Sequence, residues 1–428
     1  MIKKVLRFIV TIVLVIILVF DVMFLSAVLN PDKKTVIADW LEDVIAYLEE
    51  GTGDGTEDAC AEIEPAITET ITETITGEIL TEPSKSSLVT YHKLSEEEKH
   101  IYHLLRDGIA SYAKSIEIRP GVEKSILEKC ITCVYMDHPE YYWFDNNYTY
   151  WIIESTGEVS SIEPAYLMTE EEIAANEPII QRAAEAILSK VPAEGSVYDK
   201  VKHIYEALIL FTEYDSECAY NQSMASVFLQ GQSECAGYAK AMQYLLHEIG
   251  IPCTYISGTA VPFTSEDGNA ESHAWNIAEV NGQYYYIDAT WGDPVPYEGE
   301  KKKEIEYGYL CSAPQSFEQS HFPELPVEMP ACTSEELEYY RINQMYYETF
   351  TYEEINGRLI EMTKNGQNRI EFAFATDEAY QQMLVELMEK DLADEAGEIR
   401  AFMRGTDRWQ WSISYNDYLR SIEFEWVI

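Results

Sequence analysis

The hydrophobic pattern begins with one long apolar segment near the N-terminus. Residues 8–29 are almost entirely apolar, and Lys3, Lys4 and Arg7 precede them. A helix of this length crosses the ~30 Å hydrocarbon layer of a bilayer and keeps its positive end in the cytoplasm. We therefore expect residues 1–30 to be an uncleaved transmembrane anchor, with the globular part extracytoplasmic. A cleaved signal peptide, which would make the protein secreted, is the alternative.

Two further segments separate this apolar run from the first globular pattern. In residues 31–50, hydrophobic positions recur at helical spacing, which predicts a juxtamembrane amphipathic helix. Residues 51–90 contain no aromatic residue and nine acidic residues against one lysine. Such a composition buries too little apolar surface to fold. We expect an acidic, Thr/Glu-rich linker that stays extended by self-repulsion.

Residues 91–170 carry the mixed pattern of a small, aromatic-rich α+β region. Ser95 followed by Glu98 is a capping box, which predicts the start of a helix. Further along, aromatic residues alternate around Asn146 and Asn147, which predicts a short β-hairpin there. The region therefore combines helical and strand-like periodicity.

Two cysteines in the same region, Cys130 and Cys133, have the spacing of metal ligands. No second Cys or His pair follows at the distance that a zinc site requires, so buried cysteines on a helix are the better interpretation. Residues 137–140, Asp-His-Pro-Glu, also contain metal-ligand residue types. We interpret them as the turn that ends the helix.

The remaining pattern divides into residues 171–330 and residues 331–428. A second capping box begins at Thr169, and another helix begins at Ser196. After residue 331 the order of helix, strand, helix and strands predicts a C-terminal α+β domain. No catalytic pairing stands out in this domain, and a role in partner or cell-wall binding is an open alternative.

Composition and charge exclude one large class of function. Asp and Glu outnumber Lys and Arg by 75 to 30, a formal net charge of −45. Such a chain repels phosphate backbones and lacks the cations that nucleic-acid binding requires, so we expect no nucleic-acid partner. Hydrophobic residues make up 46% of the chain and include 31 Tyr and 8 Trp. That aromatic content predicts a packed interior.

The first element of candidate chemistry is a cysteine at a predicted helix N-terminus. Ser233 is the expected N-cap, after which residues 234–249 have a helical pattern closed by Gly250. Cys235 then lies in the first turn, where free backbone N–H groups and the helix dipole stabilise a thiolate. Taken alone, such a cysteine is more often simply buried in the core.

The second element is a hairpin that carries a histidine and an aspartate. Asn281-Gly282 between two strand-like segments predicts a type I′ turn, so the numbers of cross-strand partners add to 563. Trp275 then opposes Asp288, and His273 lies diagonally from Asp288 on the same face. The carboxylate can therefore orient the imidazole, as in nucleophilic catalysis. A solvated His and a turn Asp are the alternative interpretation.

These residues resemble the core of the transglutaminase-like superfamily, which has a papain-type fold. The resemblance covers roughly residues 198–317 and includes the lead-in typical of bacterial extracytoplasmic, membrane-anchored members. It rests on five motifs in this order: residues 232–246 (QSECAGYAKAMQYLL), residues 250–253 (GIPC), Gly258, residues 273–276 (HAWN) and residues 288–293 (DATWGD).

The resemblance implies a fold and a set of roles. The expected fold is α+β, with the catalytic Cys at a helix N-terminus packed on an antiparallel sheet that carries His and Asp. Smaller α+β regions lie on both sides of this core. By position, Cys235 matches the family nucleophile, His273 the general base and acid, and Asp288 the residue that orients it. The oxyanion or substrate-binding candidates are Gln222, Gln232 and Trp275.

The expected function is that of a thiol enzyme acting on amide bonds of proteins or peptides. Cys235 would form a thioester acyl-enzyme, followed by hydrolysis, as in a protease or amidase, or by transfer to an amine. Bacterial members of the superfamily favour hydrolysis. No cofactor and no metal site are expected, and calcium dependence is not inherited because Ala236 replaces the tryptophan of the calcium-dependent animal enzymes. The alternative is a non-catalytic surface binding or scaffold module, with cell-surface or cell-wall contacts.

Overall fold

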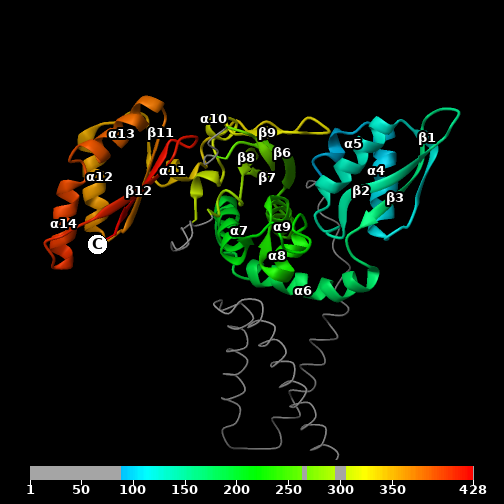
Figure 1. The fold of residues 1–428 in the computed structure, drawn as a ribbon, viewed down its shortest axis with the longest axis horizontal. Helices are drawn as coiled ribbons and strands as arrows, with labels where there is room; N and C mark the ends of the chain where they lie inside the picture. The colour runs from blue at the N-terminus through cyan, green and yellow to red at the C-terminus, as the bar shows by residue number, and fades with distance from the viewer. Residues whose placement is uncertain (1–87, 263–267, 295–304, 428) are drawn as a thin grey trace, which may run out of the picture. The chain divides into compact units, whose positions relative to one another are not determined.

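The computed structural model describes residues 88–262, 268–294 and 305–427 (Figure 1). The predicted membrane anchor and juxtamembrane helix lie outside these residues, as does nearly all of the predicted linker. Among the helices that are described, none combines the length and apolar character needed to span a bilayer. The described chain is a mixed α+β structure, in agreement with the predicted class.

The first described region packs two helices against a three-stranded antiparallel sheet. Ser95 caps the first helix: its side chain accepts a hydrogen bond from the Glu98 N–H, and the Glu98 carboxylate accepts one from the Ser95 N–H, as predicted. The sheet order is β1-β3-β2. The elements are η2 (Tyr91–Lys93), α4 (Glu96–Ala110), β1 (Ile116–Val122), α5 (Lys124–Asp137), β2 (Phe144–Ile152) and β3 (Val159–Tyr166).

The hairpin of this region turns at a different place from the one predicted. β2 runs straight through Asn146 and Asn147, and Asn146 has a φ of 66° where the register shifts. One left-handed residue inside a strand makes a bulge, and the pairing of β2 with β3 continues on both sides of it. The chain reverses later, where the Gly157 N–H donates to the Ile153 carbonyl at 2.8 Å. The prediction of a turn at the two asparagines is therefore wrong.

The central region packs its central helix against a second antiparallel sheet, of order β8-β7-β6-β9. The Asn276 side-chain amide donates to the Ala239 carbonyl at 2.9 Å and so ties the sheet to its central helix, α9. The elements are α6 (Glu170–Leu188), α7 (Val197–Phe211), β4 (Glu213–Tyr214), α8 (Met224–Gln230), β5 (Gln232–Ser233), α9 (Cys235–Glu248), β6 (Cys253–Ala260), β7 (Glu271–Val280), β8 (Gln283–Ile287), η3 (Tyr307–Tyr309), α10 (Pro314–Phe317) and β9 (His321–Pro323).

The predicted register of the β7–β8 hairpin is confirmed. Val280 pairs with Gln283 and Asn276 with Ile287, so the partners' numbers add to 563 along the ladder. The two turn residues, Asn281 and Gly282, have φ values of 55° and 78°. Two successive left-handed residues define the type I′ turn, which matches the twist of the strands it joins.

Backbone and side-chain contacts join the first region to the central one. The Gln243 amide of α9 donates to the Met136 carbonyl of α5 at 2.8 Å. The Ser223 hydroxyl donates to the Tyr142 carbonyl at 2.7 Å. One hydrophobic core also contains buried residues from both regions. The two regions therefore share an interior.

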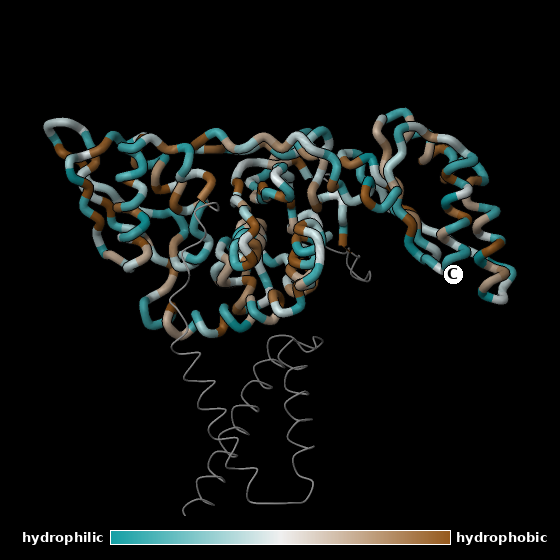
Figure 2. Tube along the Cα trace, turned by 180° about the vertical axis from the view of Figure 1, so that it is seen from behind, coloured by the Kyte–Doolittle hydropathy of each residue, from teal (hydrophilic) through white to brown (hydrophobic). Residues whose placement is uncertain are grey.

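The C-terminal region has its own core and a four-stranded sheet of order β10-β11-β13-β12. Hydrophobic and hydrophilic residues alternate along its helices and strands (Figure 2). The region contains both helices and strands, as expected from its sequence. The elements are α11 (Tyr339–Ile342), β10 (Tyr346–Tyr347), α12 (Tyr352–Lys364), β11 (Arg369–Phe374), α13 (Asp377–Glu389), α14 (Asp394–Arg404), β12 (Trp411–Asn416) and β13 (Ser421–Trp426).

Candidate active site

Cys235 is the first residue of α9, and its side chain is partly exposed. The expected N-cap is wrong by one position, because Glu234 occupies it and its side chain makes no capping bond. Ser233 lies in β5 instead, and its hydroxyl bonds inward to the Asn221 carbonyl at 2.9 Å and to the Ser226 hydroxyl at 2.7 Å. The sulfur therefore lies at the positive end of the helix dipole.

His273 and Asp288 form a buried hydrogen-bonded pair. The His273 Nε2 lies 2.7 Å from the Asp288 Oδ2, and the Asp288 side chain is fully buried. Burial alone would lower the pKa of His273, but the charge and hydrogen bond of Asp288, together with Cys235, raise it to about 10. The positively charged imidazole is thus the favoured form beside the carboxylate.

The Asp288 carboxylate is held from both sides. Its Oδ1 accepts from the backbone N–H groups of Thr290 at 2.9 Å and Trp291 at 3.0 Å. Burial would raise the pKa of Asp288, but the charge of His273 and the hydrogen bonds from His273 and His321 keep it well below its usual range. Asp288 therefore stays ionised, as an orienting partner for an imidazolium must.

The three candidates for oxyanion or substrate binding lie in different surroundings. Gln222 is exposed on the surface. The Gln232 amide donates to the Asp215 carboxylate at 3.1 Å, which fixes that side chain. Trp275 is only 1% exposed, and its Nε1 has no hydrogen-bond partner within the described residues.

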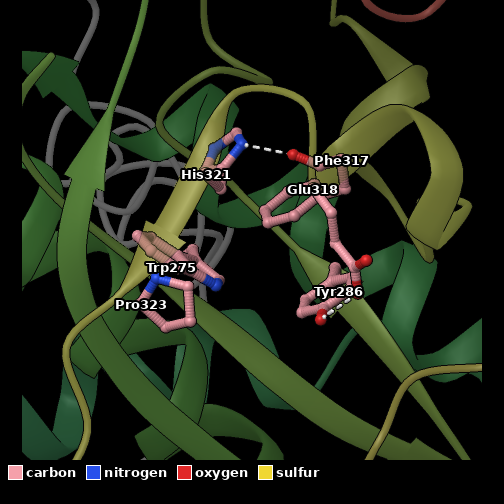
Figure 3. A pocket seen from close by; sticks show the side chains of 6 residues that line it. All are labelled: Trp275, Tyr286, Phe317, Glu318, His321 and Pro323. Atoms are coloured by element: carbon pink, nitrogen blue, oxygen red, sulfur yellow. Dashed lines mark hydrogen bonds between the residues drawn. The ribbon is translucent and has the colours of Figure 1, made fainter.

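Trp275 lines a small pocket on the His273 face of the sheet (Figure 3). The cavity measures about 240 Å³, and the Tyr286 hydroxyl donates across its wall to the Glu318 carboxylate at 2.9 Å. The lining is therefore largely aromatic, with one hydrogen-bonded carboxylate in its wall. Its lining residues are Trp275, Tyr286, Phe317, Glu318, His321 and Pro323.

Two tyrosines near Cys235 were not foreseen from the sequence. Tyr135 of α5 and Tyr255 of β6 belong to the same hydrophobic cluster as Cys235, and their rings meet at 5.7 Å and 83°. The Lys240 ammonium lies 3.2 Å from the centre of the Tyr135 ring. Burial lowers the pKa of Lys240 well below its usual value. No periodic pattern in the sequence could link α5 to Cys235, because the contact is tertiary.

A third tyrosine, Tyr214 of β4, pairs with Ser233, two residues before Cys235, and is 43% exposed. Burial, Cys235 and the acidic Glu234 raise the pKa of its hydroxyl to about 12.

A second histidine, His321 of β9, completes the group around Asp288. Its Nε2 lies 3.2 Å from the Asp288 Oδ2. Within residues 88–262, 268–294 and 305–427, His273, Asp288 and His321 are the one group whose metal-ligand atoms all lie within 4.8 Å of one another. The hydrogen bonds among them account for this closeness.

Together these features define a class of fold. A helix that begins with a cysteine packs on an antiparallel sheet, and the sheet carries a histidine that is oriented by an aspartate. Such an arrangement has the groups needed for covalent acyl transfer. The comparison with known families names the class more closely. Residues 183–289 match the model of the transglutaminase-like superfamily, so the chain carries a transglutaminase-like domain.

Similar proteins are recognised over part of the chain. The kyphoscoliosis peptidase of Mus musculus is 25% identical over 137 residues, covering 29% of this chain and 21% of the relative. The Homo sapiens protein of the same name is 24% identical over 137 residues, with the same coverage. The chain thus spans about a fifth of the length of these curated relatives.

Among solved structures, the periplasmic domain of TgpA from Pseudomonas aeruginosa is similar at 15% identity. The match covers 32% of this chain and 55% of that one, with a TM-score of 0.20.

Proposed function

We propose that this protein is a thiol enzyme that attacks amide carbonyls of proteins or peptides through Cys235. The observation that carries the proposal is the buried His273–Asp288 hydrogen bond of 2.7 Å beside a partly exposed cysteine at a helix N-terminus. A histidine whose charged form is favoured can hold a neighbouring thiol as thiolate. Thiolate, not thiol, is the species that attacks carbonyl carbon.

The first half of the proposed reaction exchanges an amide for a thioester. The Cys235 thiolate attacks the carbonyl carbon, and the oxygen takes up negative charge opposite the N–H groups of the first helical turn. When the C–N bond breaks, the His273 imidazolium gives its proton to the leaving nitrogen. The products are a free amine and an acyl group on sulfur, with His273 left neutral.

The second half returns the enzyme to its starting state. Neutral His273 takes a proton from water, and the resulting hydroxide attacks the thioester carbonyl. The C–S bond breaks, a carboxylic acid leaves, and Cys235 recovers its thiolate beside the imidazolium. We favour hydrolysis, which makes the protein a peptidase or amidase. A primary amine in place of water would give a new amide by the same route.

We propose that the catalytic region works on the outer side of a membrane. The support is the sequence of residues 1–30, a basic start followed by an apolar run, and the acidic linker after it. Substrates reached from there would be extracytoplasmic proteins or wall peptides.

The experiment is the pH dependence of iodoacetamide alkylation, read cysteine by cysteine on the full chain in mild detergent. We expect Cys235 to react at pH 6 at least about tenfold faster than Cys218, a partly exposed thiol that serves as an internal control. In His273→Ala this advantage should disappear. Equal rates for the two cysteines in the unmodified chain would favour the alternative, a non-catalytic binding or scaffold module.

A second measurement separates hydrolysis from transfer. The chain is incubated with a mixture of extracytoplasmic peptides, with and without a fluorescent primary amine. Shortened peptides or new carboxylic acids would support hydrolysis. Incorporation of the amine would instead identify a transferase. The Cys235→Ala variant is the matched control for both readouts.

A further inference from the structure

His321 reaches the site through a close contact between two strands. β9 pairs antiparallel with β6, and Gly258 faces Pro323 in this ladder. A Cβ atom at Gly258 would lie 2.2 Å from the Phe322 carbonyl oxygen, so only glycine permits this approach. The glycine thus allows β9 to bring His321 next to the residues that follow β8.

His321 and His273 share one oxygen of Asp288. The Oδ2 lies 2.7 Å from the His273 Nε2 and 3.2 Å from the His321 Nε2. Because the other oxygen accepts two backbone N–H groups, the buried carboxylate has four hydrogen-bonding partners. Rotation of the carboxylate would break bonds on both sides at once.

The surroundings of His321 fix which ring nitrogen carries the proton. A carboxylate only accepts, so the Nε2 must donate to Asp288. The Nδ1 lies 2.9 Å from the Ser320 hydroxyl, which can donate to it, and 3.2 Å from the Phe317 carbonyl (Figure 3). Burial, together with the charge of His273, lowers the pKa of His321 although Asp288 opposes the shift. With the proton on Nε2, the neutral ring donates to Asp288 and accepts at Nδ1 from the Ser320 hydroxyl. The Phe317 carbonyl only accepts, so it would bond to Nδ1 only in the charged, doubly protonated ring. In both forms the Nε2–H donates to Asp288.

Aromatic packing holds the His321 ring in this orientation. The ring stacks on Phe317 at 3.7 Å and 17° and meets Trp291 at 4.4 Å. The titratable groups around it are Asp288, His273 and Tyr309, and Glu318 shares its pocket wall. The residue is 3% exposed. A buried, stacked ring with one fixed N–H is a rigid donor.

We propose that His321 is a positioning residue, which fixes the Asp288 carboxylate so that Oδ2 stays aligned with the His273 Nε2. The inference rests on the proposed role of His273 and Asp288. His321 does not touch the reacting atoms: it acts through Asp288 on the orientation of the His273 ring. Without this second donor, the carboxylate can turn away from His273, and the thiolate–imidazolium pair weakens.

The test compares His321→Phe with His321→Gln in the full chain. Phenylalanine keeps the ring packing and removes the donor, whereas the glutamine amide can replace the Nε2–H. We expect His321→Phe to slow Cys235 alkylation at pH 6 by about tenfold, and His321→Gln to stay within about threefold of the unmodified chain. A purely structural role would instead affect both variants through stability, measured as the thermal midpoint.

A spectroscopic readout makes the test independent of reactivity. The proton on the His273 Nε2 that faces Asp288 should give a low-field ¹H NMR signal, assigned by its loss in His273→Gln. In His321→Phe this signal should shift or broaden, and in His321→Gln it should remain. An unchanged signal and an unchanged alkylation rate in His321→Phe would overturn the proposal.

Two outcomes separate this proposal from the proposed function. If Cys235 is unreactive in every variant but the low-field signal responds to His321→Phe, His321 positions Asp288 although the enzyme claim fails. If His321→Phe does not fold, Ser320→Ala takes its place, because it removes the hydroxyl that can donate to the Nδ1. About threefold slower alkylation with a shifted signal is then expected. An unshifted signal in Ser320→Ala would count against the proposal.

Discussion

Two regions of this protein each bury an aspartate next to a histidine, yet only in one of them does a charged imidazole bond to the carboxylate. In the first region, Asp137 accepts hydrogen bonds from the Thr90 N–H and hydroxyl, the Tyr91 N–H and the Tyr102 hydroxyl. All of these donors are neutral, and burial raises the pKa of Asp137. At Asp288, burial would also raise the pKa, but the charge and hydrogen bond of His273 lower it below its usual range.

The cysteines of the two regions also differ in their burial and in their position on a helix. Cys130 and Cys133 lie on α5 and are fully buried, as predicted, and burial raises the pKa of both thiols to about 12. Cys235 is partly exposed and starts a helix. Residue types alone therefore do not make a thiol site. The position of the cysteine on its helix and the charge of its neighbours do.

The largest effect is expected from Asp288→Asn. The amide keeps the size of the side chain but removes the negative charge that stabilises the His273 imidazolium. We expect Cys235 alkylation at pH 6 to fall by at least about a hundredfold. The measurement is the alkylation rate of the folded full chain. A change of less than about threefold would mean that Asp288 plays the same structural role as Asp137.

Stability should depend on pH through the same pair. The folded pKa of His273 is raised to about 10. Its contribution to the free energy of unfolding is therefore complete below the unfolded pKa of about 6.5 and is lost as the pH rises through about 10. We expect the difference in thermal midpoint between the unmodified chain and His273→Gln to shrink steadily from pH 6 to pH 10. A constant difference over this range would contradict the charged pair.

The equivalent change in the first region, Asp137→Asn, should affect stability and leave the chemistry unchanged. The amide nitrogen introduced by this substitution is a hydrogen-bond donor, and it would face N–H and O–H groups that also donate. We expect this mismatch to lower the free energy of unfolding by about 1–3 kcal/mol. Urea unfolding measures this loss. The alkylation rate of Cys235 in the folded protein should stay within about twofold of the unmodified chain. A larger change would show that the two buried aspartates are coupled.

The smallest effect is expected from Cys133→Ala. Removal of one buried sulfur should cost about 1 kcal/mol in the free energy of unfolding and leave Cys235 alkylation unchanged. In the unmodified chain, Cys133 should react with iodoacetamide only as fast as the region opens. Rapid modification of Cys133 under native conditions would refute the burial on which the comparison depends.

The part of the site that could be predicted from the sequence depends on short-range geometry. The Asn281-Gly282 turn fixes its own register, and the register determines which residues face each other across β7 and β8. Helix periodicity likewise places Cys235 in a first turn. His321 could not be found in this way, because β9 pairs with β6, far from it in sequence.

Asn281-Gly282 and Asn146-Asn147 show the limit of predicting turns from local sequence. Asn281 is followed by glycine, so two left-handed residues in succession reverse the chain. Asn146 is followed by another asparagine, and one left-handed residue only bulges the strand. Distinguishing these outcomes requires knowledge of where β3 lies. The positions of Tyr135 and Tyr255 near Cys235 depend in the same way on tertiary packing.

The contacts of α5 with α9 have a consequence for what counts as the working unit of this protein. The family match begins at residue 183, but the Met136 carbonyl accepts from Gln243, and Tyr135 packs in the cluster that contains Cys235. A fragment cut at the start of the match would leave the Gln243 amide without this partner and remove the Tyr135 side chain from the cluster around Cys235. The segment that matches the family model is therefore shorter than the segment that folds as one unit.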